Sequence, residues 1–160
     1  IGFDGDGDRI GVVDEKGNIV WGDMLVLVFA RDVISRKPGA KIIGDVKCSN
    51  RLFSGINEAG GEAIMWKTGH SLIKDKMKVE KASLAGEMSG HIFFADKFFG
   101  YDDALYASLR ILEIISRTGK SLSRLLEGIP PAISTPEIRV DCPEAIKFRD
   151  VDMMKERLGK

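Results

Sequence analysis

The sequence predicts an α/β domain in which helices cover an open β-sheet. Two observations support this prediction. Short apolar runs that resemble strands alternate with longer segments of helical periodicity from residue 19 to about residue 127. The segments between them contain glycine, proline and asparagine, which favour turns and end helices. This alternation is typical of a sheet whose strands are joined by helices.

The expected elements follow one another closely. A hairpin is expected first, with a strand over 9–14, a turn over 15–18 and a returning strand over 19–21. Further strands are expected over 41–45, 62–66, 83–85 and 91–94. Helices are expected over 24–36, 49–59, 71–79, 102–116 and 121–126. Gly22-Asp23 offers an N-cap for the first helix. The helix over 102–116 shows the clearest periodicity, with apolar residues at Ala104, Leu105, Ala107, Leu109, Leu112 and Ile115.

The C-terminal part of the sequence has a different character. Pro130-Pro131 and Thr135-Pro136 mark a linker. An extended strand is expected over 137–141, and a short helix over 150–158. These last 30 or so residues have too few apolar side chains for a core of their own, so they are expected to begin another domain.

The amino-acid composition argues against nucleic acids and membranes as binding partners. The 160 residues include 24 basic and 24 acidic side chains, and this balance argues against a nucleic-acid surface or a polybasic membrane patch. The longest apolar run, 24–30, is too short to span a bilayer. A small molecule is the expected partner. The two cysteines fit no zinc spacing or disulfide framework, which favours a cytoplasmic location. Because a charged motif begins three residues after Ile1, the chain is expected to be a piece of a longer protein.

The first motif whose residues could bind a ligand or act in catalysis is Asp4-Gly5-Asp6-Gly7-Asp8-Arg9. Glycines between the aspartates let the backbone curl until the carboxylates converge. Converging carboxylates repel one another unless a cation lies among them, so a hard divalent metal is the expected occupant. Arg9 suits a site that also receives a phosphate. The alternative is an acidic surface turn.

An EF-hand calcium loop matches the same carboxylates only in part. Asp4, Asp6, Asp8 and Glu15 occupy its first, third, fifth and twelfth positions. However, Arg9 stands where that loop requires glycine, and the following residues have the pattern of a strand rather than of a helix. The sequence therefore excludes the EF-hand.

The second motif, Gly86-Glu87-Met88-Ser89-Gly90-His91, lies between two apolar strands. Its carboxylate, hydroxyl and imidazole supply both donors and acceptors, a mixture that sugar hydroxyls require. Spacing alone does not separate a sugar-binding loop from a polar hairpin turn.

The third motif, 66–71 (WKTGHS), joins a strand to a helix. In open α/β sheets, ligands bind outside the carboxyl ends of the strands. Lys47 occupies the equivalent position after the preceding strand. Alone, His70 is also compatible with a helix-capping or core histidine, and Lys47 with a solvated side chain.

Taken in order, DGDGDR, DVK, KTGHS and GEMSGH resemble the phosphomannomutase/phosphoglucomutase family of α-D-phosphohexomutases. The likeness extends over nearly the whole chain and includes FGYDD at 99–103. It implies a four-domain enzyme in which 1–21 ends the second domain, 22–130 is the third, and 131–160 links to the fourth. It also implies a three-layer α/β/α fold with a small mixed sheet, preceded by a β-hairpin and the metal loop from the preceding domain.

The resemblance also implies roles for individual residues. Mg²⁺ would be held by Asp4, Asp6 and Asp8 together with a phosphoserine from another domain. Glu87 and Ser89 would bind two adjacent sugar hydroxyls. The other family positions lie near the phosphate and the reacting end of the sugar; they are Arg9, Lys47, His70 and His91. His70 is a candidate for the proton transfer, since imidazole changes protonation near neutral pH.

The implied activity interconverts the 1- and 6-phosphates of mannose or glucose through a phosphoserine enzyme and a bisphosphate intermediate. The sequence contains neither a segment like the family's phosphorylated serine loop nor its phosphate-binding loop. The chain alone is therefore expected to be inactive, and its partners are expected to be a phosphosugar and the remaining domains. Two alternatives stay open, a non-catalytic sugar- or metal-binding module and a phosphatase with an aspartate nucleophile. Against the phosphatase, Asp8 stands where that class has threonine or valine.

Overall fold

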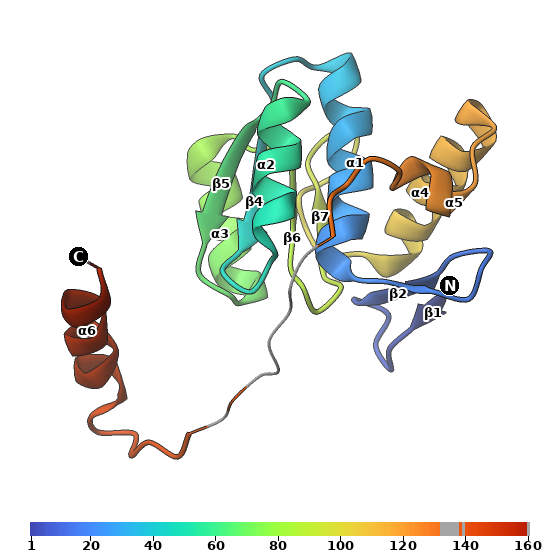
Figure 1. Ribbon diagram of the computed structural model, residues 1–160. Helices are drawn as coiled ribbons and strands as arrows, with labels where there is room; N and C mark the ends of the chain where they lie inside the picture. Colours follow the sequence, from blue (N-terminus) through green and yellow to red (C-terminus); the bar gives the residue numbers. More distant parts are fainter. Residues whose placement is uncertain (132–137, 139, 160) are drawn as a thin grey trace.

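The computed structural model describes residues 1–131, 138 and 140–159 (Figure 1). Its larger sheet has four strands in the order β5-β4-β6-β7. The bounds are β4 Lys41–Asp45, β5 Glu62–Trp66, β6 Leu84–Gly86 and β7 Ile92–Phe94. The first three are parallel to one another and β7 pairs with β6 in the antiparallel direction, so the sheet is mixed.

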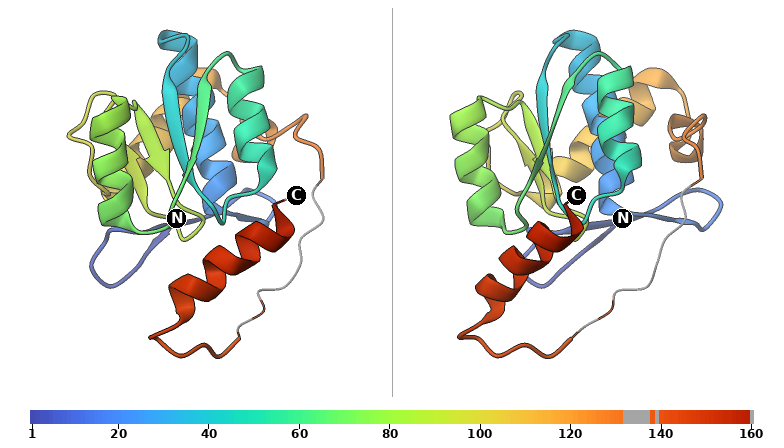
Figure 2. Two further views of the ribbon diagram at one scale, coloured as in Figure 1. Left: turned by 90° about the vertical axis from the view of Figure 1, so that its left-hand side faces the viewer. Right: turned by 60° about the vertical axis from the view of Figure 1, so that its left-hand side comes forward.

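Helices cover both faces of this sheet. Helices α1 (Gly22–Arg36) and α2 (Asn50–Glu58) lie on one face, and α3 (His70–Glu80) lies on the other, as the right-hand view of Figure 2 shows. Alternate residues of each strand point to opposite sides. One core therefore contains Ile42, Leu84 and Phe94, packed with α1 and α2, and the other contains Ile43, Ala85 and Phe93, packed with α3. The expected three-layer α/β/α fold is confirmed.

A small antiparallel sheet precedes these layers. It has the order β1-β2-β3, with β1 at Gly2–Phe3, β2 at Ile10–Val13 and β3 at Ile19–Val20. Ile10 and Val12 of β2 are buried and belong to the core that also contains residues of α4 (Ala104–Thr118). The expected hairpin is confirmed, with Val12 opposite Val20 and Val13 opposite Ile19.

The other strands and helices expected between residues 22 and 127 also form, with ends shifted by at most two residues, but the expected N-cap of the first helix was wrong. Helix α1 begins at Gly22 without a side-chain cap, and Asp23 is buried inside its first turn instead. In α4, Leu105, Leu109 and Leu112 are exposed. The buried face consists of Ala104, Ala107, Ser108, Arg110, Ile111 and Ile114.

Arg110 is the charged residue on the buried face of α4. Its guanidinium lies 3.2 Å from Asp32 of α1 and 3.4 Å from Asp96. A buried charge needs such partners, so Asp32 and Asp96 allow this face, with its apolar residues, to pack against α1. The leucines on the opposite side then face outward.

Two short helices follow, α5 at Leu122–Leu125 and α6 at Lys147–Leu158. The helix expected over 150–158 is confirmed, although none of the residues 147–158 is buried. Thr135-Pro136 and most of the strand expected over 137–141 lie outside the described residues. In the part of the chain that the structure describes, no helix has the length and apolar character needed to cross a bilayer.

Candidate functional site

Three of the expected site segments lie at one edge of the main sheet. Because β4, β5 and β6 are parallel, their carboxyl ends meet at the same edge. Lys47 follows β4, His70 follows β5 as the first residue of α3, and Glu87 follows β6. This is the edge at which open α/β sheets bind ligands. Lys47 and His70 are both exposed there.

The three aspartates converge on the turn between β1 and β2. Asp4, Asp6 and Asp8 each offer a carboxylate oxygen, and these oxygens lie within 4.8 Å of one another. The turn is closed by Arg9, whose backbone N–H donates to Asp4 Oδ1 at 3.1 Å and whose Nε donates to Asp4 Oδ2 at 2.6 Å. Half of the Arg9 side chain remains exposed.

The turn brings three carboxylates together with one arginine, which hydrogen-bonds only to Asp4. Arg9 lowers the pKa of Asp4 to about 2, chiefly through its side-chain hydrogen bond. The pKa of Asp8 is raised, first by loss of solvent and then by the neighbouring Asp6 and Asp4, although His91 acts in the opposite direction. Three oxygens that converge and repel one another fit a hard dication such as Mg²⁺.

The loop over 86–91, which we call the hydroxyl-binding loop, lies directly against this turn. Ile10 donates its backbone N–H to the carbonyl of Gly90 at 3.1 Å, and Arg9 forms a β-bridge with His91. Gly90 has a φ of +98°, and a Cβ there would lie 2.6 Å from the Ile10 carbonyl oxygen. Only glycine permits this approach without strain. The fold therefore brings two motifs 80 residues apart into contact.

Glu87 is held firmly within that loop. It is only 3% exposed. Its Oε1 accepts the backbone N–H of Gly69 at 2.6 Å, and its Oε2 accepts the hydroxyl of Ser89 at 3.2 Å. Each carboxylate oxygen has a further lone pair. Ser89 itself is exposed, so a hydroxyl can reach the loop from the solvent side.

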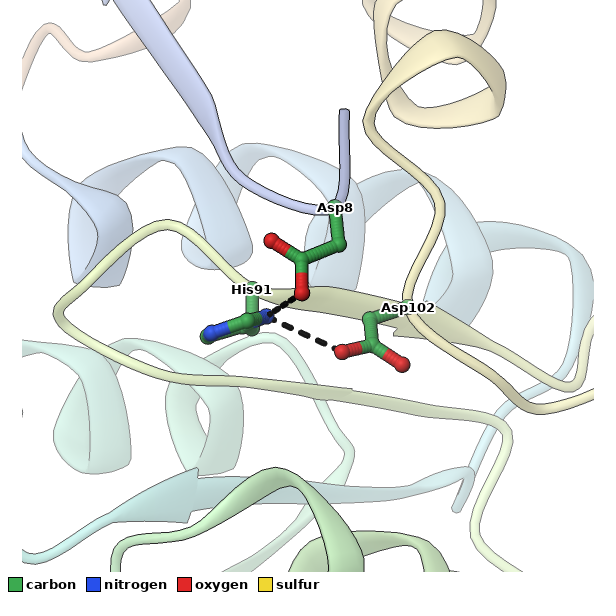
Figure 3. Close-up of side chains that lie close together, drawn as sticks. All are labelled: Asp8, His91 and Asp102. Carbon is green, nitrogen blue, oxygen red and sulfur yellow. Dashed lines mark ion pairs between the residues drawn. The ribbon is translucent and has the colours of Figure 1, made fainter. Parts of the chain in front are cut away.

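His91 connects the two motifs (Figure 3). Its Nδ1 lies 3.0 Å from Asp102 Oδ2 and 3.7 Å from Asp8 Oδ2. Its ring also stacks on that of His70, with centroids 6.0 Å apart. Of the nine expected site residues, the structure thus brings Asp4, Asp6, Asp8, Arg9, His70, Glu87, Ser89 and His91 into one connected region. Lys47 lies on the same edge.

Two acidic residues in this region were missed by the sequence interpretation. Asp102 has a side chain only 8% exposed, and Lys74 of α3 lies 3.2 Å from its Oδ1. Asp45 ends β4 and is 1% exposed. It accepts hydrogen bonds from Thr68 Oγ1 at 2.9 Å, Met88 N at 3.2 Å and Cys48 Sγ at 2.9 Å. The available signal for Asp45 was a carboxylate at the carboxyl end of an apolar strand; the signal for Asp102 was its place in the FGYDD segment of the family resemblance.

Comparisons with known proteins agree on one family. The family described as "Phosphoglucomutase/phosphomannomutase, alpha/beta/alpha domain III" matches residues 21–133. A relative from Pseudomonas putida, named phosphomannomutase/phosphoglucomutase, is 53% identical over 155 residues, which are 97% of this chain and 34% of the relative. The chain therefore spans about a third of the length of this relative.

Solved structures show the same fold. A phosphoglucomutase/phosphomannomutase family protein from Burkholderia thailandensis is 54% identical with a TM-score of 0.78, covering 84% of this chain and 29% of that one. An N-acetylphosphoglucosamine mutase from Aspergillus fumigatus, solved with GlcNAc-6P and magnesium, has a TM-score of 0.60 at 16% identity, covering 77% of this chain and 34% of that one. The second likeness concerns the fold alone.

Proposed function

Because this chain belongs to the phosphoglucomutase/phosphomannomutase family, we propose that it is part of a phosphohexomutase that interconverts hexose 1-phosphates and 6-phosphates. The hexose is mannose, glucose or both. The observation that carries the proposal is the contact between the three-aspartate turn and the hydroxyl-binding loop, through Ile10 and Gly90. A metal bound by the three aspartates would contact a phosphoryl group, while the adjacent loop would form hydrogen bonds with the hydroxyls of a sugar in the same site.

Asp4, Asp6 and Asp8 would hold Mg²⁺. Their oxygens converge, and the pKa of Asp8 is raised first by loss of solvent and then by Asp6 and Asp4, whose repulsion a dication would relieve. When bound, Mg²⁺ supplies positive charge toward the oxygens of a transferring phosphoryl group. Arg9, half exposed beside the aspartates, would add a second positive charge there.

Glu87 and Ser89 would bind two adjacent hydroxyls of the sugar. The hydrogen bonds that Glu87 accepts from Gly69 and Ser89 fix its carboxylate in one orientation. The side chain therefore loses little conformational entropy when a sugar binds. His91 and Lys47 would contact the substrate nearby. His70, exposed and stacked on His91, would carry the proton of the reacting hydroxyl.

The reaction we propose needs parts of the longer protein outside residues 1–160. A phosphoserine transfers its phosphoryl group to the free hydroxyl of the hexose phosphate, and the hydroxyl proton passes to the base. The resulting bisphosphate turns round and returns its other phosphoryl group to the serine. We assign 1–21 to the end of one domain, 22–130 to a second and 131–160 to the link with a third. The two free cysteines are compatible with a cytoplasmic location.

The proposal is tested in the full-length protein with two variants. Glu87→Ala should lower kcat/KM about 10- to 150-fold, the equivalent of one charge-assisted hydrogen bond of roughly 1.5–3 kcal/mol. It should leave the Mg²⁺ requirement and the phosphorylation of the serine by a bisphosphate unchanged. Asp6→Ala should abolish turnover by removing a metal ligand.

The isolated chain of 160 residues supplies the matching control. Incubated with glucose 1-phosphate, glucose 1,6-bisphosphate and Mg²⁺, it should form no glucose 6-phosphate above the blank. Steady turnover by this chain would contradict the proposal that the nucleophile lies elsewhere. A Glu87→Ala enzyme with altered metal dependence and normal sugar discrimination would contradict the division of roles between the two motifs.

A further inference from the structure

We propose that Asp8, His91 and Asp102 form a second metal site, selective for a transition-metal dication such as Zn²⁺. The three side chains come from three separate segments: the β1–β2 turn, the end of the hydroxyl-binding loop and the segment before α4 (Figure 3). Each offers one ligand atom, and the three atoms lie within 4.8 Å of one another. Two of these residues, His91 and Asp102, do not belong to the three-aspartate turn.

The two distances from His91 to the carboxylates of this cluster suit tetrahedral coordination. Bonds of about 2.0–2.1 Å to zinc, at tetrahedral angles, separate neighbouring ligand atoms by roughly 3.3 Å. His91 Nδ1 lies 3.0 Å from Asp102 Oδ2 and 3.7 Å from Asp8 Oδ2, on either side of that value. The Asp8 side chain is 34% exposed, so water can enter and supply a fourth ligand.

The Nδ1 atom of His91 has no hydrogen-bond partner among the described residues. Its Nδ1 is buried, yet neither nearby carboxylate is aligned with the ring well enough to count as a hydrogen-bond partner among the described residues. The 3.0 Å distance from Nδ1 to Asp102 Oδ2 is thus a close approach without a hydrogen bond. An unpaired buried nitrogen costs free energy. A metal held by the imidazole lone pair and the two carboxylates would remove that cost.

Asp102 is prepared to act as an anionic ligand. Its other oxygen, Oδ1, lies 3.2 Å from Lys74 Nζ, which leaves Oδ2 directed at His91. Burial acts to raise the pKa of Asp102, but a hydrogen bond from its own backbone and the charge of Lys74 lower it overall. A ligand that is oriented by a neighbour outside the metal shell is typical of protein metal sites.

The two sites should select different ions. The turn presents oxygen only, which suits Mg²⁺, whereas imidazole favours zinc and related metals. Asp8 belongs to both sets. A transition metal at the cluster would therefore withdraw Asp8 from the turn, so the two ions should compete. This competition rests on the proposed function of the turn, but the existence of the cluster site does not.

The site can be tested by Co²⁺ titration of the 160-residue chain, since tetrahedral Co²⁺ absorbs visible light strongly. Cys142→Ser serves as the parent, because Cys142 is an exposed thiol that binds soft metals. Cys48 needs no replacement: it is buried, and burial together with Asp45 raises the pKa of its thiol. We expect one equivalent of Co²⁺ to bind with visible bands, and Zn²⁺ to displace it.

Three variants in this parent locate the ion. Asp102→Asn and His91→Gln should each weaken Co²⁺ binding at least about 100-fold, beyond what loss of an outer partner causes. Asp6→Asn, which removes an oxygen of the turn only, should change the affinity less than about threefold. Circular dichroism verifies that each variant folds. If His91→Gln does not fold, the Co²⁺ affinity of Asp102→Asn decides the question.

Two results would overturn the site. The first is Co²⁺ binding of parental strength in Asp102→Asn. The second is an equal loss in Asp6→Asn and Asp102→Asn, which would place the ion in the turn. Mg²⁺ at millimolar concentration should weaken Co²⁺ binding, and an unchanged Co²⁺ affinity would overturn the competition. None of these results depends on mutase turnover, so failure here is distinct from failure of the proposed function.

Discussion

The carboxylates of the β1–β2 turn and those at the carboxyl edge of the main sheet are chemically alike but are held in opposite ways. Asp23 and Asp45 are each 1% exposed and Glu87 is 3% exposed. On the turn, by contrast, the side chains of Asp4 and Asp8 are 21% and 34% exposed. The first group is bound by hydrogen-bond donors of the chain itself, whereas the second group lies next to other carboxylates.

The buried group organises the edge of the sheet. Asp45 binds donors in the β4–α2, β5–α3 and β6–β7 loops. Asp23 accepts the backbone N–H groups of Met24 and Ser49 at 2.8 and 3.0 Å. The hydrogen-bond donors to these buried carboxylates are mostly backbone N–H groups and hydroxyls rather than cationic side chains. Their role is to set the loops in place before any ligand binds.

The turn has the opposite character. Loss of solvent and then the neighbouring Asp6 and Asp4 raise the pKa of Asp8, and Arg9 engages only Asp4 through hydrogen bonds. The difference indicates which region needs an ion. The carboxylates at the sheet edge are paired with donors of the chain, whereas we expect added positive charge to stabilise the turn.

The largest expected effect concerns the buried group. Asp45→Ala leaves three donors without an acceptor, each worth about 1–3 kcal/mol when buried and unpaired. We expect the free energy of unfolding to fall by about 3–5 kcal/mol, measured by urea denaturation. Asp45→Asn, which keeps one acceptor oxygen, should lose less. A loss below about 1 kcal/mol in Asp45→Ala would show that these hydrogen bonds do not organise the edge.

The next effect tests the contact between the two regions. In Gly90→Ala, a residue at φ +98° would be strained and its Cβ would clash with the Ile10 carbonyl. We expect a loss of about 2–4 kcal/mol in the free energy of unfolding. Gly5→Ala is the matched control, because a Cβ there meets nothing within 4 Å. If both variants unfold at the same urea concentration, the turn and the hydroxyl-binding loop are not in contact in solution.

These contacts also show how far sequence reasoning reaches. The alternation of strands and helices, the hairpin and the edge carrying Lys47 and His70 followed from local periodicity and from the direction of parallel strands. The proximity of Asp102 did not follow, because it depends on the antiparallel β7 and on the bridge between Phe93 and Asp102. Such a pairing joins residues through the sheet and leaves no mark on local periodicity.

The orientation of α4 was unpredictable for a related reason. Its apolar residues cover two faces, and periodicity alone does not decide which face is buried. The structure buries the face that carries Ile111 and Ile114, where Arg110 pairs with Asp32 and Asp96. The position of those two acids becomes known only when α1 and the segment after β7 have been placed.

A smaller effect concerns the ion that the turn should hold. Mg²⁺ keeps much of its water and usually takes part of its shell from a phosphate. Since these residues supply only three carboxylates, we expect Mg²⁺ to bind the isolated chain weakly, at about millimolar concentration. Calorimetric titration measures the affinity, and Asp6→Asn should remove the binding without destabilising the fold. Submicromolar affinity in the isolated chain would contradict this expectation.

The smallest effect is a pair of opposite pH dependences within the turn itself. The folded-state pKa of Asp4 is about 2, below its usual value of 3.8, so its ionised form stabilises the fold above pH 3.8. That contribution is lost as the pH falls through about 2. The pKa of Asp8 is raised, so its ionisation destabilises the fold at neutral pH and this cost disappears on acidification. Asp4→Asn should therefore lower the melting temperature slightly at pH 6 and Asp8→Asn should raise it, with both differences shrinking toward low pH. Both groups are solvated, so salt should reduce the two differences. If Asp8→Asn were instead destabilising at neutral pH without metal, the turn would be a satisfied structural element like the buried group, and the contrast between the two regions would be wrong.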